Sequence, residues 1–285
     1  ISGSQARTAM GAGESPLAIP PVDLREGKRS GDLPAWVPEP DLALGMGLAF
    51  TRPSRSRMAW AARAEEALSR LTGRSEWRFV HELLGVVAFW VLDLPASEDH
   101  HHRGRFGLFD HSLEVGSGTI QGLEGRWKEK GSAPRMKVLE CALWSRVAFT
   151  VGLLHDIGKV QDLTVRGGAG GAEWDPLREP LALFKRRHGL TVLGPTDFHY
   201  RRGRGLRGHL EKGNSVASVL FSGRIGKDLW PFLGRALDSY AAYSLRPGRS
   251  FPVPFPDLAP LVSTADGASR REGRPETSGA RGEGS

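Results

Sequence analysis

The chain has 285 residues, enough to bury a substantial apolar core in one large or two small domains. Hydrophobic residues make up 39% and charged residues 25%, a balance that excludes a fibrous or wholly disordered chain. The formal net charge is +7 and the arginines gather in short clusters, which suits phosphate-bearing partners, although any one cluster more often belongs to a solvated surface.

The two ends of the chain differ in composition from its middle. Residues 1–40 are rich in Gly, Pro, Ser and scattered charge, and residues 271–285 offer almost nothing to bury, so both are expected to be disordered or linker-like. Residues 1–10 show no secretory signal, which together with the single cysteine fits a reducing cytoplasm. The sequence begins with Ile1 rather than Met, so we expect a fragment of a longer protein. The single cysteine, Cys141, excludes an intrachain disulfide framework.

Between these ends, residues 41–270 are expected to form one domain of all-α architecture. The apolar run Leu83 to Leu92 is far shorter than the roughly 20 residues of a membrane-spanning helix, so it predicts a buried helix and no membrane segment. Apolar residues recur at helical spacing over 58–71, 77–92, 110–127, 138–157, 209–221, 227–243 and 258–270.

Pro95 and Gly158 are expected to end two of these helices, Gly158 through a left-handed cap. Two stretches resist a helical interpretation. Residues 167–174 read as a glycine-rich loop, and residues 191–201 as a short strand or extended segment.

His155 and Asp156 close a helix whose preceding turns, residues 147–154, are apolar nearly all round. A buried aspartate costs several kcal/mol, about 3–5, unless it is paired, hydrogen-bonded or bound to a metal. The adjacent pair therefore suggests a metal site. The alternative is that the two side chains cap neighbouring helices.

His111 and Asp266 interrupt apolar faces of two other predicted helices. His111 shares a face with Val115 at i and i+4, so it is expected to face the core. Asp266 follows the apolar residues Leu261, Val262 and Ala265. Each alone is more often a satisfied core residue than a metal ligand.

The order of a histidine, a His-Asp pair and a distant aspartate resembles the signature of the HD hydrolase superfamily. The resemblance implies an HD-domain-like helical bundle in which His111, His155, Asp156 and Asp266 bind one or two divalent ions. Imidazole with carboxylate suits Mn, Fe, Zn, Ni or Co better than Mg alone. In the sequence His-Asp-Ile-Gly-Lys, Lys159 is similar to the superfamily's lysine near the substrate phosphate, so Lys159 and Asp156 are the candidate catalytic residues.

A second stretch narrows the family. The sequence Leu-Pro-Ala-Ser-Glu-Asp-His-His-His over 94–102, followed by Gly-Leu-Phe-Asp-His-Ser-Leu-Glu-Val over 107–115, resembles the signature of MobH-type relaxases, the TraI-like group of integrating conjugative elements. The similarity spans about residues 35–270 and implies an N-terminal HD domain. Expected partners are DNA at a transfer origin and other conjugation proteins. Full-length members of the group that it resembles carry a further C-terminal domain, whereas the given sequence turns to low complexity soon after Asp266.

The triplet His100, His101 and His102 is a candidate site wall or second metal site. In an extended chain only the first and third side chains share a side, so at most two serve one ion. The alternative is a solvated run. His209, which opens a predicted helix, is a further candidate ligand for a second metal, and His188 and His199 are weaker ones.

A basic run follows residue 200 and is expected to hold the DNA backbone or substrate phosphates; its candidate residues are Arg201, Arg202, Arg204 and Arg207. Tyr200 is the best candidate for a tyrosine nucleophile, although a structural role is the more common one for such a residue.

Three functions remain open at this point. The first is metal-dependent nicking of DNA at a transfer origin, and the second is hydrolysis of nucleotides or cyclic dinucleotides by the same centre. The third is a catalytically idle domain that binds DNA or partner proteins. The chain contains no Gly-x-x-x-x-Gly-Lys-[Ser/Thr] phosphate loop, so no ATPase is predicted.

Overall fold

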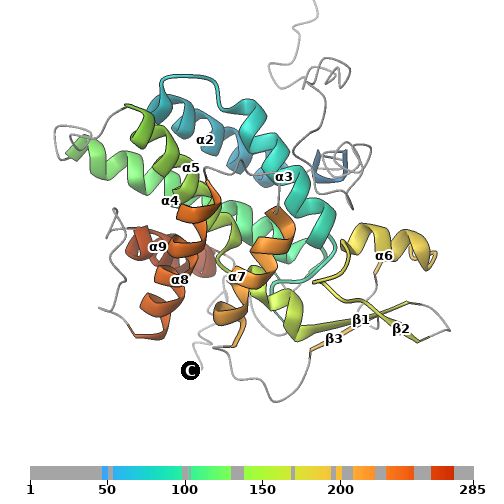
Figure 1. Ribbon diagram of the computed structural model, residues 1–285. Coiled ribbons are helices and arrows are strands. Elements are labelled where there is room, and N and C mark those ends of the chain that lie inside the picture. The colour runs from blue at the N-terminus through green and yellow to red at the C-terminus, as the bar shows by residue number, and fades with distance from the viewer. Residues whose placement is uncertain are drawn as a thin grey trace, which may run out of the picture. The chain divides into compact units, whose positions relative to one another are not determined.

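A computed structural model shows a predominantly helical chain, which confirms the all-α prediction (Figure 1). It describes residues 47–50, 54–97, 102, 104–129, 138–167, 171–193, 197–200, 208–221, 229–246 and 258–272. The helices are α2 (Arg55–Thr72), α3 (Trp77–Val91), α4 (Gly107–Glu129), α5 (Val138–Leu154), the 3-10 helix η1 (Ile157–Asp162), α6 (Leu181–Arg187), α7 (Gly208–Phe221), α8 (Trp230–Leu245) and α9 (Leu258–Glu272).

Local chemistry sets the ends of α2. The side chain of Ser54 accepts a hydrogen bond from the backbone N–H of Arg57 at 3.0 Å, which satisfies one of the unpaired donors of the first turn. At the other end Gly73 adopts φ 70°, and its N–H donates to the carbonyl of Ser69. Only glycine takes this left-handed conformation without steric cost, so the helix stops there.

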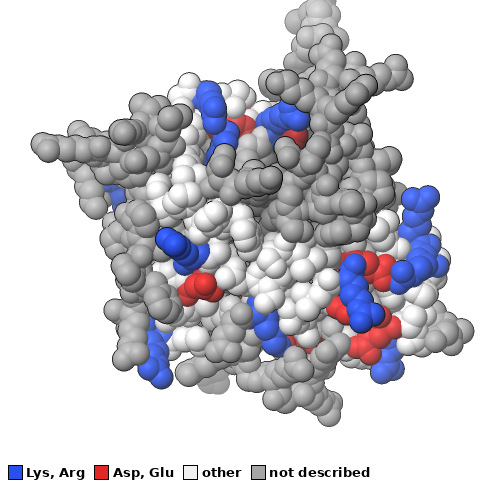
Figure 2. Space-filling view, viewed as in Figure 1, with Lys and Arg blue, Asp and Glu red and all other residues white. Residues whose placement is uncertain are grey.

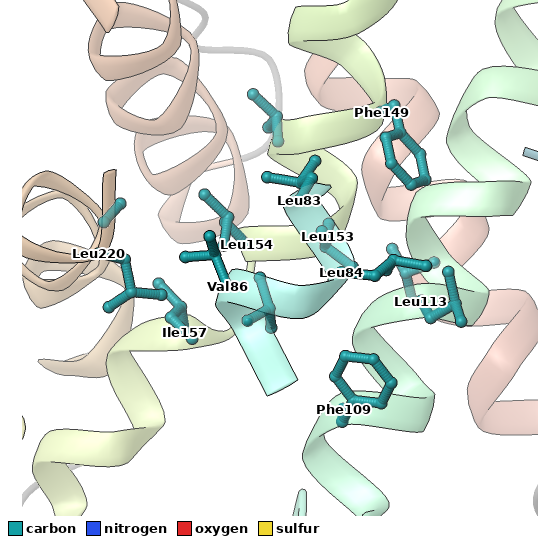
Figure 3. Packing of buried hydrophobic residues seen from close by; sticks show 14 of the residues in the cluster. Leu83, Leu84, Val86, Phe109, Leu113, Phe149, Leu153, Leu154, Ile157 and Leu220 are labelled. Atoms are coloured by element: carbon teal, nitrogen blue, oxygen red, sulfur yellow. The ribbon is translucent and has the colours of Figure 1, made fainter. Parts of the chain in front are cut away.

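Helices α4 and α5 lie at the centre of the packing. Helix α4 contacts α2, α5 and α9, and α5 also contacts α2 and α8. Side chains from α3, α4, α5, η1 and α7 meet in one apolar cluster, including Leu84, Phe109, Phe149 and Leu220 (Figure 3). The predicted buried helix over 83–92 is confirmed, because every residue from Leu83 to Leu92 is buried.

Glycines allow α4 and α5 to approach each other closely. A Cβ atom added to Gly152 in α5 would lie 2.6 Å from Oγ1 of Thr119 and 2.9 Å from Cα of Gly116, both in α4. Real Cβ atoms do not approach other atoms so closely, so the absence of a side chain at residue 152 permits this crossing. The crossing lies one turn before His155.

A small antiparallel sheet of order β2-β1-β3 lies beside the helices, where α6, β1, β2 and β3 are grouped in Figure 1. Strand β1 (Leu163–Gly167) pairs with β2 (Ala172–Glu173) and with β3 (Phe198–Tyr200). The expected short strand within 191–201 is therefore confirmed. The expected loop over 167–174 is wrong in part, because Gly167 ends β1 and residues 172–173 form β2.

Several boundaries differ from the sequence prediction. Helix α5 ends at Leu154 rather than at residue 157, and Gly158 lies inside η1 rather than in a left-handed cap. Helix α8 begins at Trp230, three residues later than predicted, because Pro231 is favoured in a first turn, where its missing N–H is not needed. Helix α6 was not predicted. No helix among the described residues is long and apolar enough to cross a membrane.

Candidate metal centre

His155 and Asp156 occupy the junction between α5 and η1. Asp156 has φ −108° and ψ 7°, so the chain leaves the α-helical conformation here and tightens into the 3-10 helix. The N–H of Lys159 donates to the carbonyl of Asp156 at 3.0 Å and closes the new turn. The junction therefore presents two consecutive polar side chains at the end of a buried helix.

The structure brings His111, His155, Asp156 and Asp266 together from α4, the α5–η1 junction and α9. Nε2 of His111 lies 3.4 Å from Oδ2 of Asp156 and 3.3 Å from Oδ1 of Asp266. Nε2 of His155 lies 3.3 Å and 3.7 Å from the same two oxygens. Two imidazole nitrogens thus face two carboxylates, and we call these four residues the His-Asp cluster.

The His-Asp cluster fits a divalent metal. One ligand atom each from His111, His155 and Asp266 lies within 4.8 Å of the other two, so this group could hold an ion. Ligand atoms on a tetrahedral ion at about 2.0–2.1 Å are roughly 3.3 Å apart, close to the distances above. Nε2 of His155 is buried and makes no hydrogen bond to a described residue, which is costly for a polar atom without a further ligand.

The charges within the cluster are strongly coupled. Burial acts to raise the pKa of Asp156, but the charges of Lys159 and His155 outweigh it and hold the pKa well below its usual range. Burial likewise opposes the ionisation of Asp266, whose pKa is nevertheless lowered by the two histidines. Burial opposes protonation of His155, but Asp156 and Asp266 raise its pKa to about 9. Both carboxylates are therefore ionised at neutral pH.

Two cations lie on the carboxylates of the cluster. Nζ of Lys159 lies 2.5 Å from Oδ2 of Asp156, and Nη2 of Arg270 lies 2.6 Å from Oδ2 of Asp266. The side chains of the four members of the cluster are at most 10% exposed, whereas those of Lys159 and Arg270 are 22% and 56% exposed. These two cations therefore connect the buried cluster to the surface.

A second group lies behind His111. Nε2 of His102 is 3.2 Å from Oε2 of Glu114, and the hydroxyl of Ser269 donates to the same oxygen. Oγ of Ser269 also lies 3.0 Å from Nδ1 of His111. Burial opposes ionisation of Glu114, but hydrogen bonds from His102 and Ser269 lower its pKa. Ligand atoms of His102, His111 and Glu114 lie within 4.8 Å of one another, so this group too could hold an ion.

Tyr240 of α8 covers one side of His155. The two ring centroids are 5.8 Å apart at an interplanar angle of 82°. Burial, followed by the charges of Asp156 and Asp266, raises the pKa of Tyr240, so its phenol stays protonated. The tyrosine closes the cluster without adding a charge.

Sequence reasoning did not identify Glu114, Ser269, Arg270 or Tyr240. Glu114 follows His111 by three residues, and Ser269 follows Asp266 by three, so each shares a helix face with a predicted ligand. Arg270 follows Asp266 by four. This i+3 and i+4 spacing was the available signal for three of them, whereas Tyr240 meets the cluster only through tertiary packing.

Part of the triplet prediction is testable in the structure. His102 has φ 57°, so the chain is not extended at this residue, and the alternation that an extended triplet would have does not apply to it. The His102 ring is 5.3 Å from that of His111, beside the cluster. His100 and His101 lie outside the described residues.

Other predicted residues lie elsewhere or are not described. Arg201, Arg202, Arg204 and Arg207 fall outside the described residues, as does the side chain of His209. The remaining three candidates belong to other surroundings. His188 packs on Phe184, His199 is exposed in β3, and Tyr200 of β3 pairs through its backbone with Leu163.

The face of the molecule in Figure 2 carries basic and acidic side chains interspersed, most densely on the side where α6 and the small sheet lie. Arg187 pairs with Glu179, and Arg178 lies 3.2 Å from Asp175. In α6 and the segment before it, these basic groups therefore pair with local carboxylates.

Fold and site together define an all-α protein with a buried His-Asp cluster suited to a metal. Residues 72–219 match the model of the TraI_2 family, whose description reads "Putative helicase". The match covers more than half of the chain, so the chain belongs to this family. It includes His111, His155 and Asp156, whereas Asp266 lies beyond it. The comparisons found no matching curated protein and no matching solved structure.

Proposed function

We propose that the chain is a metal-dependent phosphodiester-processing domain of a MobH-type conjugative relaxase, with chemistry of the HD hydrolase kind. The observation that carries the proposal is the His-Asp cluster, in which residues as distant in sequence as His111 and Asp266 converge at 3.3 Å in a buried site. The TraI_2 match supports a role in conjugation, and the resemblance of residues 94–115 to the MobH signature supports a relaxase. Without a phosphate loop, no ATPase activity is proposed.

His111, His155 and Asp266, with Asp156 beside them, would hold the ion. A divalent metal bound there would supply Lewis-acid polarisation of a phosphodiester and a water of lowered pKa. Asp156 keeps Lys159 at the edge of the cluster, and Asp266 does the same for Arg270. The two cations would bind and orient the substrate phosphate, and the packed Tyr240 would limit the entry of bulk water on its side.

Hydrolysis of a small phosphate compound, such as a nucleotide or cyclic dinucleotide, is the second candidate. The burial of the cluster favours it, because His111 and His155 are at most 2% exposed and a small phosphate reaches such a site more easily than duplex DNA. The same ligands and the same two cations would serve it. Substrate preference therefore separates the two functions.

The test combines elemental analysis of the purified protein with cleavage assays on single-stranded, duplex and supercoiled DNA, nucleotides and cyclic dinucleotides in the presence of each candidate metal. Asp156→Ala and His155→Ala should each lose bound metal and activity, because each removes a group facing the ion. His199→Ala is the matched control, since this histidine is exposed in β3. Full metal content and full activity in Asp156→Ala would overturn the proposal. A chain that neither binds metal nor cleaves would instead be an idle DNA- or partner-binding domain.

A further inference from the structure

We infer that Glu114 and Ser269 form a hydrogen-bond relay that fixes the orientation and tautomer of His111 for metal binding. The inference rests on the metal centre of the proposed function but concerns two residues that hold its ligand rather than contact the ion. Ser269 in α9 is 2% exposed, and Glu114 in α4 is 12% exposed in its side chain, so both lie behind His111 inside the protein.

The direction of each hydrogen bond follows from the chemistry of the groups. An ionised carboxylate can only accept, so the Ser269 hydroxyl donates its single proton to Oε2 of Glu114. Oγ of Ser269 must then accept in its 3.0 Å contact with Nδ1 of His111. Nδ1 of His111 therefore carries a proton, so Nε2 is the nitrogen that can give its lone pair to an ion.

That lone pair belongs to the atom that faces the cluster. Nε2 of His111 lies 3.3 Å from Asp266 Oδ1 and 3.4 Å from Asp156 Oδ2, where the metal ligands converge. His102 adds a second contact on the relay, with Nε2 3.2 Å from the same Glu114 oxygen. Carboxylates that hold the far nitrogen of a ligand histidine are known to raise its basicity and fix its ring. In this protein the hydroxyl of Ser269 lies between the carboxylate of Glu114 and the ring of His111.

The same geometry argues against a second metal on His102, His111 and Glu114. Such an ion would take Nδ1 of His111 while Nε2 served the first ion, which requires loss of both imidazole protons. It would also displace Ser269, which already occupies both Nδ1 of His111 and Oε2 of Glu114. A relay accounts for all of these contacts without a second ion.

The test measures Co²⁺ binding through its visible absorption spectrum, with a chelator as competitor, together with the nitrogen NMR signals of the histidine rings in metal-free protein at mildly alkaline pH. Ser269→Ala should weaken Co²⁺ affinity about 10- to 100-fold, the usual effect of losing a group that holds a ligand histidine. Ser269→Thr should rescue most of it, because it restores the hydroxyl. The Co²⁺ affinity of Glu114→Gln should lie between those of Ser269→Ala and Ser269→Thr, because an amide oxygen still accepts a hydrogen bond but carries no charge.

Ser239→Ala is the matched control. Ser239 is also 2% exposed, in α8, and its hydroxyl makes no hydrogen bond to a described residue, so its loss should leave Co²⁺ affinity and spectrum unchanged. Melting temperatures of all variants establish that they fold. In metal-free wild-type protein the Nδ1 signal of His111 should be that of a protonated nitrogen, and in Ser269→Ala that of a mixture of protonated and unprotonated nitrogen.

Wild-type Co²⁺ affinity together with an unchanged His111 Nδ1 signal in Ser269→Ala would overturn the relay. Binding of two Co²⁺ ions per chain, one of them lost in Glu114→Gln, would make Glu114 a ligand and would also overturn it. If the wild-type chain binds no Co²⁺, the proposed metal function fails, whereas the tautomer measurement still decides the relay by itself.

Discussion

The carbonyl of Gly152 accepts a hydrogen bond from Nδ1 of His155 at 2.8 Å. The same glycine lies against Thr119 and Gly116 of α4, where a Cβ atom would come within 2.6 Å of Oγ1 of Thr119. One residue thus brings α5 against α4 and holds the ring of a cluster histidine. The packing of α5 against α4 and the orientation of the His155 ring therefore depend on the same short stretch of backbone.

Gly152→Ala is expected to destabilise the protein and weaken metal binding together. The added methyl group must push α5 away from α4, and overpacking of this kind lowers the free energy of unfolding by about 1–3 kcal/mol. Chemical denaturation and Co²⁺ titration measure the two effects. Gly125→Ala in α4 is the control, because nothing lies within 4 Å of its Cβ position. Alanine stabilises a helix by about 1 kcal/mol relative to glycine, so this variant should not lose stability. Equal stability and equal affinity in the two variants would contradict this account.

His81 provides a pH effect on stability remote from the candidate site. Its ring stacks between Phe50 and Trp77 at 4.5 Å from each, and burial lowers its pKa from 6.5 to about 4. Above pH 6.5 neither the folded nor the unfolded state binds this proton. As the pH falls from 6.5 toward 4, the unfolded state binds it first, so the free energy of unfolding should decrease, by at most about 3 kcal/mol.

The measurement is the free energy of unfolding of wild type and His81→Phe across this pH range. Phenylalanine keeps a ring between Phe50 and Trp77 but cannot titrate, so its stability should fall less steeply with decreasing pH. All other titrating groups are common to both proteins, and the difference between the curves isolates His81. Parallel curves would mean that the pKa of His81 is the same in the folded and unfolded states.

The sequence predicted most of the helices and the members of the His-Asp cluster because both depend on local pattern and on polar residues interrupting apolar faces. His111 and Asp266 stood out for that reason, and the structure brings them together. The small sheet was not predicted as a whole. Strand β1 pairs with β3 across more than thirty residues, and such a pairing gives no signal in the local sequence. The relay through Ser269 was not predicted for the same reason, because its hydrogen bonds join α4 to α9.

DNA binding is expected to weaken steeply with salt, because arginines that neutralise phosphates release condensed counterions. Changing Arg201 and Arg204 together to alanine should reduce the slope of log affinity against log salt by about 1 for each arginine that had neutralised a phosphate. Fluorescence anisotropy with a labelled DNA single strand at several salt concentrations measures this slope. Arg178→Ala, which removes an exposed arginine paired with Asp175, should leave the slope unchanged. A flat wild-type plot would exclude direct contact with the DNA backbone.

The last prediction concerns the two cations on the cluster. Lys159 and Arg270 each pair with one cluster carboxylate and are more exposed than it, so a phosphate entering the site would meet both of them. Lys159→Ala should keep its metal, because an ammonium is no ligand, yet lose about 100-fold in kcat/KM, as expected for removal of a preorganised charge. Arg270→Ala should likewise keep its metal and lose kcat/KM, and inorganic phosphate should inhibit both variants less than wild type.

Lys212→Ala is the matched control, since it breaks a 2.9 Å Lys–Asp pair with Asp162. Metal content by elemental analysis separates loss of the ion from loss of phosphate binding. If Lys159→Ala retained wild-type turnover and phosphate inhibition, the lysine would serve only to neutralise Asp156.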